Sequence, residues 1–182
     1  GGVCEVLSTC GDAYLGGDDI DQALVDWLVE EMTSAELVSG TLTKAQYEVC
    51  RLTMIDAKIS LSTDTEVTVC CDLGDDVGTF ETALTRSHFE EIIGSLVDRT
   101  EAPCRQAMKD AGVKEGELDA VILVGGSTRI PLVRTLVAPV FGVAPSCDLN
   151  PDEVVAVGAA VQADVLVGGR RDMLLLDVTP LS

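Results

Sequence analysis

The sequence predicts an α/β fold in which helices cover a parallel or mixed sheet. Val121 to Val124 form a run of four consecutive apolar residues, which suits a strand buried on both faces. Gly125 and Gly126 end that strand, because glycine tolerates positive φ, and Pro131 is favoured at the first position of a helix. A strand, a glycine turn and a helix start are typical of a ligand-binding crevice. A turn that binds nothing, in any α/β domain, is the alternative interpretation.

Length and charge exclude several classes of protein. A chain of 182 residues can form one domain or two small subdomains. The 31 acidic against 12 basic residues give a net charge of -19, which argues against a surface for DNA or RNA but leaves a small phosphorylated ligand possible. No apolar run approaches the roughly 20 residues that span a bilayer, and no secretion signal opens the chain. We therefore expect a soluble protein without nucleic-acid or membrane partners.

The cysteines and the histidine predict no metal site. The 7 cysteines lack metal-binding spacing and fall within apolar patterns, so we expect reduced cysteines in the cytoplasm or another reducing compartment such as an organelle matrix. His88, the only histidine, lies among charged residues and is interpreted as a surface residue. The cysteines are Cys4, Cys10, Cys50, Cys70, Cys71, Cys104 and Cys147.

The first third of the chain predicts a strand and two helices. Val3 to Ser8 reads as a strand without a hairpin partner, which suggests that upstream strands belong to a longer protein. A helix begins near the glycines and aspartates of Leu15 to Asp21, and its apolar face places Trp27 in the core. The second helix opens with the capping box of Thr43 to Gln46. Its buried side comprises Tyr47, Cys50, Met54, Ala57 and Leu61.

Two polar residues of this second helix are candidates for ligand contact. Lys58 and Ser62 are four residues apart, so on a helix their side chains lie one above the other and could contact the same bound molecule. A solvated polar stripe is the alternative.

The middle of the chain predicts a hairpin and another helix. Val67 to Cys71 alternates in polarity and pairs with Phe80 to Leu84. A capping box at Ser87 starts the helix, Pro103 bends or interrupts it, and Gly112 ends it.

The last part predicts two helices and an apolar tail. One helix runs from Pro131 to about Phe141. Asn150 to Glu153 supplies an N-cap, a first-turn proline and two first-turn acids for the next helix, Val154 to Val167, whose small residues allow close packing. A hinge at 168–172 precedes the tail 173–182, which has nothing left to pair with and is either an edge strand or a linker to another domain.

Motifs spread over the whole chain occur in one order. They are Gly11-Asp12, Leu15 to Asp21, Ala57 to Ser62, Ile122 to Pro131, Asn150 to Glu153, Gly158 to Gln162 and Leu174 to Ser182. Together they resemble the seventy-kilodalton heat-shock (heat shock protein 70) chaperone family. The resemblance implies the second lobe of an actin-like ATPase: an α/β lobe with a ribonuclease H-like mixed sheet and helices, plus an α+β subdomain.

The resemblance also implies boundaries. Residues 1–167 form lobe II, with subdomain IIB at approximately 18–115 and subdomain IIA in the rest. Residues 168–177 are the interdomain linker, and 178–182 start the substrate-binding domain.

The resemblance assigns cofactor-binding residues for ATP or ADP. Lys58 and Ser62 contact the adenosine moiety, and Asp152 borders the pocket. The two glycines of the turn, together with Ser127 and Arg129, lie on the adenosine and phosphate side. A lysine and a serine can hydrogen-bond ribose oxygens, and a guanidinium can stack on a base. The turn is therefore better read as the adenosine wall than as a self-sufficient anion cradle. The full set is Lys58, Ser62, Gly125, Gly126, Ser127, Arg129 and Asp152.

The catalytic groups are expected elsewhere. The resemblance implies that the first lobe, with the lysine and acids that organise magnesium and the attacking water, precedes Gly1. This fragment alone is therefore predicted to be inactive as an ATPase, with no catalytic residue of its own. Ile55 stands where most members carry a glutamate that clasps the nucleotide with the lysine, so we expect weaker nucleotide retention.

Partners follow from the resemblance. The chain looks nearer to the iron-sulfur-cluster assembly branch, HscA, than to DnaK, on the evidence of Ile55 and the segments 105–113 and 161–168. This resemblance implies ATP-dependent binding and release of unfolded or iron-sulfur scaffold polypeptides. The resemblance also implies a J-domain co-chaperone and a nucleotide exchange factor as partners. The alternatives are a sugar kinase or actin-type protein and a non-catalytic interaction module. A dinucleotide fold is disfavoured, since the turn lacks a third glycine.

Overall fold

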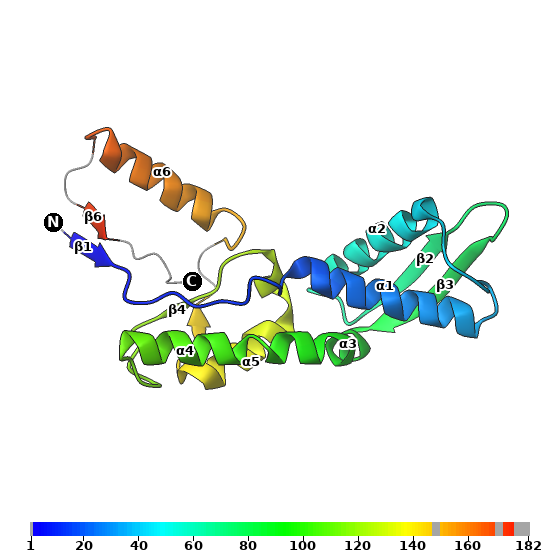
Figure 1. Cartoon of the computed structure of the whole chain (residues 1–182), viewed down its shortest axis with the longest axis horizontal. Coiled ribbons are helices and arrows are strands. Elements are labelled where there is room, and N and C mark those ends of the chain that lie inside the picture. Colours follow the sequence, from blue (N-terminus) through cyan, green and yellow to red (C-terminus); the bar gives the residue numbers. More distant parts are fainter. Residues whose placement is uncertain (1, 147–149, 170–172, 177–182) are drawn as a thin grey trace. The chain divides into compact units, whose positions relative to one another are not determined.

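The chain folds into two compact units of mixed helix and strand, which confirms the predicted α/β class (Figure 1). The computed structural model describes residues 2–146, 150–169 and 173–176. One unit comprises Tyr14–Val97, and the other comprises Gly1–Ala13 with Asp98–Ser182. Cys147, the hinge residues 170–172 and the predicted domain start at 178–182 lie outside the described residues.

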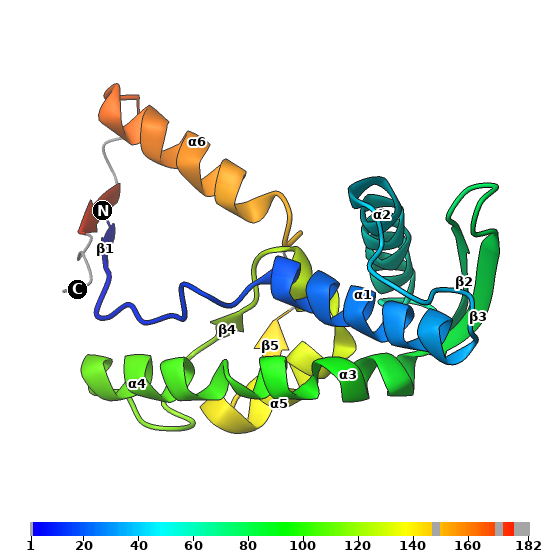
Figure 2. The ribbon, with the colours of Figure 1, turned by 45° about the vertical axis from the view of Figure 1, so that its right-hand side comes forward.

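The unit Tyr14–Val97 consists of helices around one antiparallel hairpin (Figure 2). Helices α1 (Gly17–Ser34) and α2 (Lys44–Ser60) contact each other, and α2 packs on strand β2 (Glu66–Asp72). β2 pairs with β3 (Thr79–Thr85) in the predicted hairpin, with Val69 opposite Thr82. Helix α3 (Arg86–Asp98) follows directly.

The core of this unit is made of the apolar faces that the helical spacing predicts. Every helix and both strands of the unit contribute to it. Its largest fully buried side chains include Leu24, Leu28, Met32, Met54, Leu61, Val69, Leu84, Phe89 and Ile93.

Trp27 and His88 differ in how far they are buried at the edge of this core. Trp27 is half-buried rather than a core residue, and its ring meets the ring of His88 edge-on with centroids 5.7 Å apart. The prediction that Trp27 lies in the core was therefore only partly right, because a side chain as large as an indole is rarely buried completely. His88 is exposed, as predicted, and pairs with Glu91.

Two predicted helix starts were tested by their caps. Thr43 and Gln46 form the capping box, with the Thr43 N–H donating to Oε1 of Gln46 at 2.9 Å, so this prediction is confirmed. The capping box at Ser87 was wrong, because α3 begins at Arg86 and the Thr85 hydroxyl accepts from the His88 N–H at 3.3 Å. Thr85, the last residue of β3, therefore caps the helix in place of Ser87.

The other unit contains two short parallel strand pairs. β1 (Gly2–Glu5) pairs with β6 (Met173–Leu176), and β4 (Val121–Ile122) pairs with β5 (Pro145–Ser146). The expectation that the apolar tail has nothing to pair with was therefore wrong, whereas the alternative that it forms an edge strand is confirmed for Met173–Leu176. Strands from the two ends of the chain form one ladder, which no local pattern reveals.

The helices of this unit are α4 (Glu101–Ala111), the short 3-10 helix η1 (Gly126–Arg129), α5 (Pro131–Phe141) and α6 (Val154–Leu166). α3 ends before Pro103, and α5 begins at Pro131, as predicted. The unit Tyr14–Val97 ends before the predicted subdomain boundary at residue 115, so that α4 belongs to the other unit. The lobe and linker boundaries stay predictions.

Two expectations about burial in this unit were wrong. The run Val121 to Val124 is a two-residue strand with Ile122 52% and Val124 46% exposed, rather than a strand buried on both faces. Helix α6 starts at Val154, three residues after Pro151, and none of its described residues is buried. In both cases the apolar pattern is present, but the described part of the chain supplies too little surface to cover it.

No helix in the described ranges has the length and apolarity that crossing a membrane requires.

Helices α4 and α5 both end at a glycine in the left-handed region, which offers a matched test. Gly112 has φ 70° and Gly142 has φ 67°. A Cβ on Gly112 would meet no atom within 4 Å, whereas a Cβ on Gly142 would lie 2.8 Å from Glu115 Cγ and 3.0 Å from the Gly116 nitrogen. The two positions therefore share backbone strain and differ in packing.

We predict that Gly112→Ala lowers the free energy of unfolding by about 1–2 kcal/mol, the cost of a left-handed alanine. Gly142→Ala is expected to cost roughly 1–3 kcal/mol more, since the Gly116 backbone must move. Urea unfolding followed by circular dichroism measures both. Equal losses for the two variants would contradict the packing argument.

Candidate functional site

The glycine turn after β4 is built by one left-handed residue. Gly125 has φ 87°, a conformation that residues with a Cβ rarely adopt. Its N–H donates to the Pro151 carbonyl at 2.9 Å, and its own carbonyl accepts from the Thr128 hydroxyl at 2.7 Å. Gly126 does not have positive φ, so that part of the expectation was wrong; it begins η1 instead. Gly125 is therefore the residue that allows the chain to turn.

Besides Gly125, two further backbone amides of this turn donate within the fold. Thr128 N–H donates to the Gly125 carbonyl at 3.1 Å, and Ile130 N–H donates to the Ser127 carbonyl at 3.2 Å. These two donors are not available to a ligand, because a 3-10 turn uses them internally. The turn is thus poorly suited to cradle an anion with its amides alone, whereas its exposed glycine surface can lie against a flat ligand.

Arg129 projects from the end of η1 and is held by two residues of the loop before α6. Its Nε and Nη2 both donate to Oδ2 of Asp152, at 3.1 and 2.5 Å, and Nη2 also donates to Oδ1 of Asn150 at 3.3 Å. Asn150 Oδ1 in turn accepts from the Asp152 N–H at 3.1 Å. The Arg129 and Asp152 side chains are 47% and 51% exposed. Solvent screens such a pair, so Arg129 can leave it at a cost of about 0–1 kcal/mol.

The structure therefore brings four predicted site residues together. Gly125 bonds to the segment that carries Asp152, a Cβ on Gly126 would lie 3.8 Å from Asp152 Oδ1, and Arg129 pairs with Asp152. Ser127 follows within η1 and is exposed. Asn150 was expected only as a helix cap; it caps no helix and positions the arginine instead.

Lys58 lies in the other unit, in the last turn of α2, and has a partner that the sequence reasoning missed. Its Nζ is 2.5 Å from Oδ1 of Asp21 on α1. The two side chains are only 18% and 9% exposed, and Asp21 Oδ1 has no other polar partner within the described residues. A buried carboxylate requires a counter-charge, so this pair fixes the position of the ammonium. Two of its three protons remain for other acceptors.

Ser62 is not on the helix that carries Lys58, contrary to expectation. α2 ends at Ser60, and Ser62 lies in the following turn, where its N–H donates to the Ile59 carbonyl at 3.1 Å. The helical pattern was extended too far because Leu61 and Ser62 continue the polarity of the last turn. Ser62 is half-buried, and Ile55 lies one turn before Lys58.

The predicted set is thus divided between the two units. Lys58 and Ser62 belong to Tyr14–Val97, and the other residues belong to Asp98–Ser182. Asp21 could have been suspected from the sequence, because it closes the aspartate motif beside the buried Ile20 and is itself 6% exposed. The role of Asn150 had no sequence signal distinct from an N-cap.

Comparison with known proteins gives the family. The profile described as Hsp70 protein matches residues 1–182. The chain belongs to the Hsp70 family. The nucleotide-binding domain of Hsp70 proteins has the actin-like ATPase fold, with which the mixed helix and strand content agrees.

Similar Hsp70 proteins include both branches that the motifs suggested. The chain is similar to the chaperone protein dnaK of Cyanophora paradoxa, with 50% identity over 187 residues, and to the chaperone protein HscA of Edwardsiella ictaluri, with 46% identity over 183 residues. It is 48% identical over 187 residues to the chloroplastic heat shock 70 kDa protein 6 of Arabidopsis thaliana. All of the chain is covered in each case, but only 30%, 28% and 26% of the respective relatives. These identities do not separate the branches.

The buried pair can be tested by stability. We predict that Asp21→Ala lowers the free energy of unfolding by about 3–5 kcal/mol, since it leaves the Lys58 ammonium half-desolvated without a partner. Asp21→Leu combined with Lys58→Met is expected to recover most of that loss. Urea unfolding followed by the fluorescence of Trp27, the only tryptophan, reports this unit.

The matched control is the exposed pair of the same helix. Arg51 and Glu48 lie 2.7 Å apart with side chains 38% and 51% exposed, so Glu48→Ala should leave the stability nearly unchanged. An Asp21→Ala variant as stable as Glu48→Ala would contradict the assignment.

Proposed function

We propose that this chain forms one wall of the adenosine nucleotide site of an ATP-dependent Hsp70 chaperone. The observation that carries the proposal is Arg129, which is held beside the Gly125 turn by an exposed pair with Asp152. Because the pair is weak, the guanidinium is available, and a planar guanidinium can stack on a purine base. Membership of the Hsp70 family supports ATP or ADP as the ligand.

Lys58 and Ser62 supply the polar groups for the ribose in this proposal. The ammonium of Lys58 is oriented by Asp21 and retains donors for ribose oxygens, and the hydroxyl of Ser62 lies four residues further along. Gly125 and Gly126 leave room for close approach, and Ser127 offers a hydroxyl on the phosphate side. Asp152 borders the pocket once Arg129 has moved to the base.

Hydrolysis in this proposal belongs to the whole protein. Phosphoryl transfer depends on groups placed around the γ-phosphate and on magnesium, and we assign these to another lobe of the full-length chaperone. The 182-residue chain is expected to bind nucleotide weakly and to turn over no ATP by itself. Among the described residues, no group of three or more His, Cys, Asp or Glu side chains gathers into a metal-binding set.

The nucleotide site is tested by binding. In the full-length protein, Arg129→Ala should weaken ADP binding about tenfold, which corresponds to roughly 1.4 kcal/mol of stacking energy. Ser62→Ala should weaken it about fivefold, through the loss of one hydrogen bond of about 1 kcal/mol. Isothermal titration calorimetry with ADP measures both effects.

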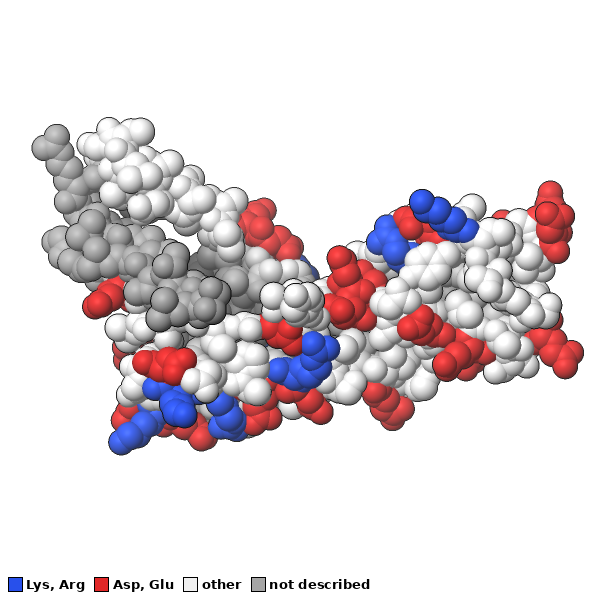
Figure 3. Space-filling view, in the orientation of Figure 1, with Lys and Arg blue, Asp and Glu red and all other residues white. Residues whose placement is uncertain are grey.

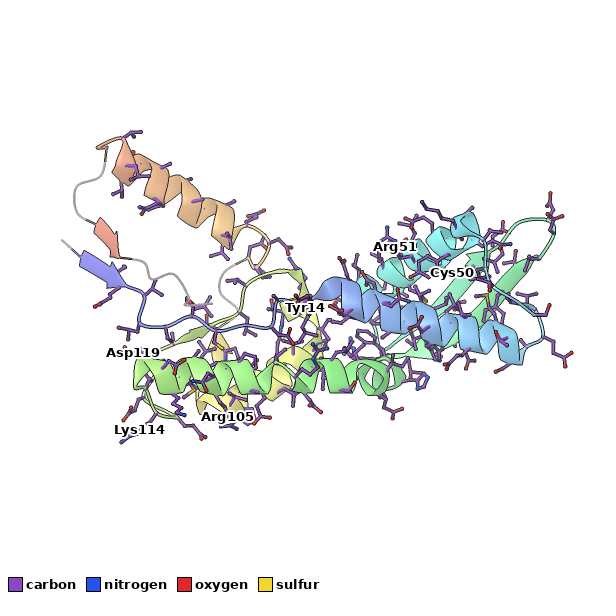
Figure 4. The ribbon with its side chains drawn as sticks, viewed as in Figure 1. Tyr14, Cys50, Arg51, Arg105, Lys114 and Asp119 are labelled. Carbon is purple, nitrogen blue, oxygen red and sulfur yellow. The ribbon has the colours of Figure 1, made fainter. Side chains whose placement is uncertain are left out.

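Arg105→Ala is the matched control for this experiment. Arg105 is also an exposed arginine with an acidic partner, Glu101 at 2.7 Å, but it lies on α4 away from the glycine turn (Figure 4). Its replacement should leave ADP affinity unchanged. Equal affinities for Arg129→Ala and Arg105→Ala would refute the assignment of Arg129.

Ile55 generates a second test of the site. An acid at this position would lie one helical turn from Lys58, and together they could close over a nucleotide, so Ile55→Glu in the full-length protein should slow ADP release. Stopped-flow displacement of a fluorescent ADP measures the rate. Leu52→Glu introduces the same charge at an exposed position of α2 that is six residues from Lys58, too far along the helix to pair with its ammonium, and should leave the rate unchanged. A release rate that Ile55→Glu does not alter would count against the proposed clasp.

The client and partners are proposals of a coarser kind. We propose that the full-length protein couples nucleotide state to the binding and release of unfolded polypeptides in the cytoplasm or an organelle matrix. A J-domain co-chaperone and a nucleotide exchange factor would act with it. Similarity to the protein named HscA keeps an iron-sulfur scaffold as a possible client class. The acidic side chains spread over both units in Figure 3 do not favour nucleic acid as a partner.

A further inference from the structure

Two buried cysteines of the unit Tyr14–Val97 lie in contact. Cys50 is on α2 and Cys71 is on β2, 21 residues further along the chain (Figure 4 labels Cys50). Their Sγ atoms are 3.6 Å apart, and both residues are fully buried. At this separation the sulfurs are in van der Waals contact, so no other atom lies between them.

The alternation of β2 separates this pair from the neighbouring cysteine. Cys71 faces the core, where it lies opposite Phe80 in the ladder, whereas Cys70 is exposed on the other face opposite Glu81. Cys70 is therefore directed away from Cys50. The chain thus contains a contacting thiol pair and, one residue away, a natural control.

The hydrogen bonds of the pair favour a thiolate on one sulfur. Either thiol can donate to the other, and hydrogen bonding from Cys50, with a further bond from Thr53, lowers the pKa of the Cys71 thiol. The same hydrogen bond, together with burial, raises the pKa of Cys50. A thiolate beside a protonated thiol is the arrangement of an attacking sulfur and its resolving partner.

We propose that Cys50 and Cys71 are an oxidative modification site, at which a hydroperoxide converts the two thiols into a reversible disulfide that links α2 to β2. A disulfide bond is about 2.05 Å long, so the sulfurs must approach by roughly 1.5 Å from their present contact. Rotation of the two side chains and a small shift of α2 over the hairpin supply this movement. Since both sulfurs are buried, the oxidant enters when α2 opens locally from β2.

The chemistry balances with one peroxide for two thiols. The Cys71 thiolate attacks one oxygen of the peroxide, the O–O bond breaks, and Cys71 becomes a sulfenic acid. The other oxygen leaves as hydroxide or alkoxide and takes a proton from solvent, which replaces the one that Cys71 released on ionisation. The Cys50 sulfur then attacks the Cys71 sulfur, the S–O bond breaks, and the hydroxide leaves as water with the Cys50 proton. Both sulfurs are oxidised and the peroxide is reduced; a dithiol reductant reverses the step by exchange.

The site has a structural consequence that does not depend on nucleotide binding. The link closes the loop between residues 50 and 71, which restricts the unfolded chain and ties the helix that carries Lys58 to the hairpin. Oxidation is therefore expected to raise the melting temperature of this unit, provided that the small shift of α2 causes little strain.

Peptide mapping tests the proposal directly. The full-length protein is treated with hydrogen peroxide, unfolded, alkylated, digested with trypsin and analysed by mass spectrometry. We expect a linked pair of the tryptic peptides 45–51 and 59–86, two hydrogens lighter than their sum, which disappears after treatment with dithiothreitol. Because the second peptide contains Cys70 and Cys71, Cys70→Ser is the matched variant and should retain the link. Cys71→Ser and Cys50→Ser should lose it.

The rate of link formation gives a second readout. Formation should be faster at higher pH, because a thiolate is the attacking species. The oxidised protein should melt at a higher temperature by Trp27 fluorescence, and dithiothreitol should reverse the shift. Full alkylation of both cysteines after peroxide treatment, or a link that Cys70→Ser abolishes, would overturn the proposal.

Discussion

The contact between Asp21 and Lys58 constrains the unit that contains the first half of the proposed site. A carboxylate that is 6% exposed must be compensated, and Lys58 is the cation that the fold brings to it. The pair links α1 to α2, two helices that also bury Leu24 and Met54 in the core of this unit. A consequence is that Lys58 is oriented before any ligand arrives. Less of the entropy of a long side chain then remains to be lost on binding.

In the second half of the proposed site the charged pair is exposed rather than buried. Arg129 is paired with Asp152 in solvent, where an ion pair contributes little, so the arginine can exchange partners. The left-handed Gly125 and its bond to Pro151 hold the loop in place, while the side chain stays free to move. A lysine held by Asp21 and an arginine that can exchange partners are both compatible with the roles proposed for them in nucleotide binding. The Hsp70 family membership supports that interpretation but does not by itself assign the residues.

Much of the local structure could be predicted because its signals are local. The capping box at Thr43, the hairpin around Gly74 to Gly78, the start of α5 at Pro131 and the glycine end of α4 depend on residues a few positions apart. The errors occurred where neighbours compete. Thr85 capped α3 before Ser87 could, and Asn150 bonded to the Asp152 amide in a turn rather than starting α6. A sequence pattern identifies the residues that could cap a helix, but it does not show which of them forms the hydrogen bond to the backbone.

The sequence by itself determined the α/β class, the order of most helices and strands, the polar residues that accompany the glycine turn, and the family to which the chain belongs. The tertiary structure decided that β1 pairs with β6, that Val124 is exposed, that Asp21 holds Lys58, and that Cys50 touches Cys71. The physical reason is distance along the chain. Periodicity and capping arise from contacts within a turn or two, whereas the partner of a buried charge, a strand edge or a thiol is chosen by packing between distant segments.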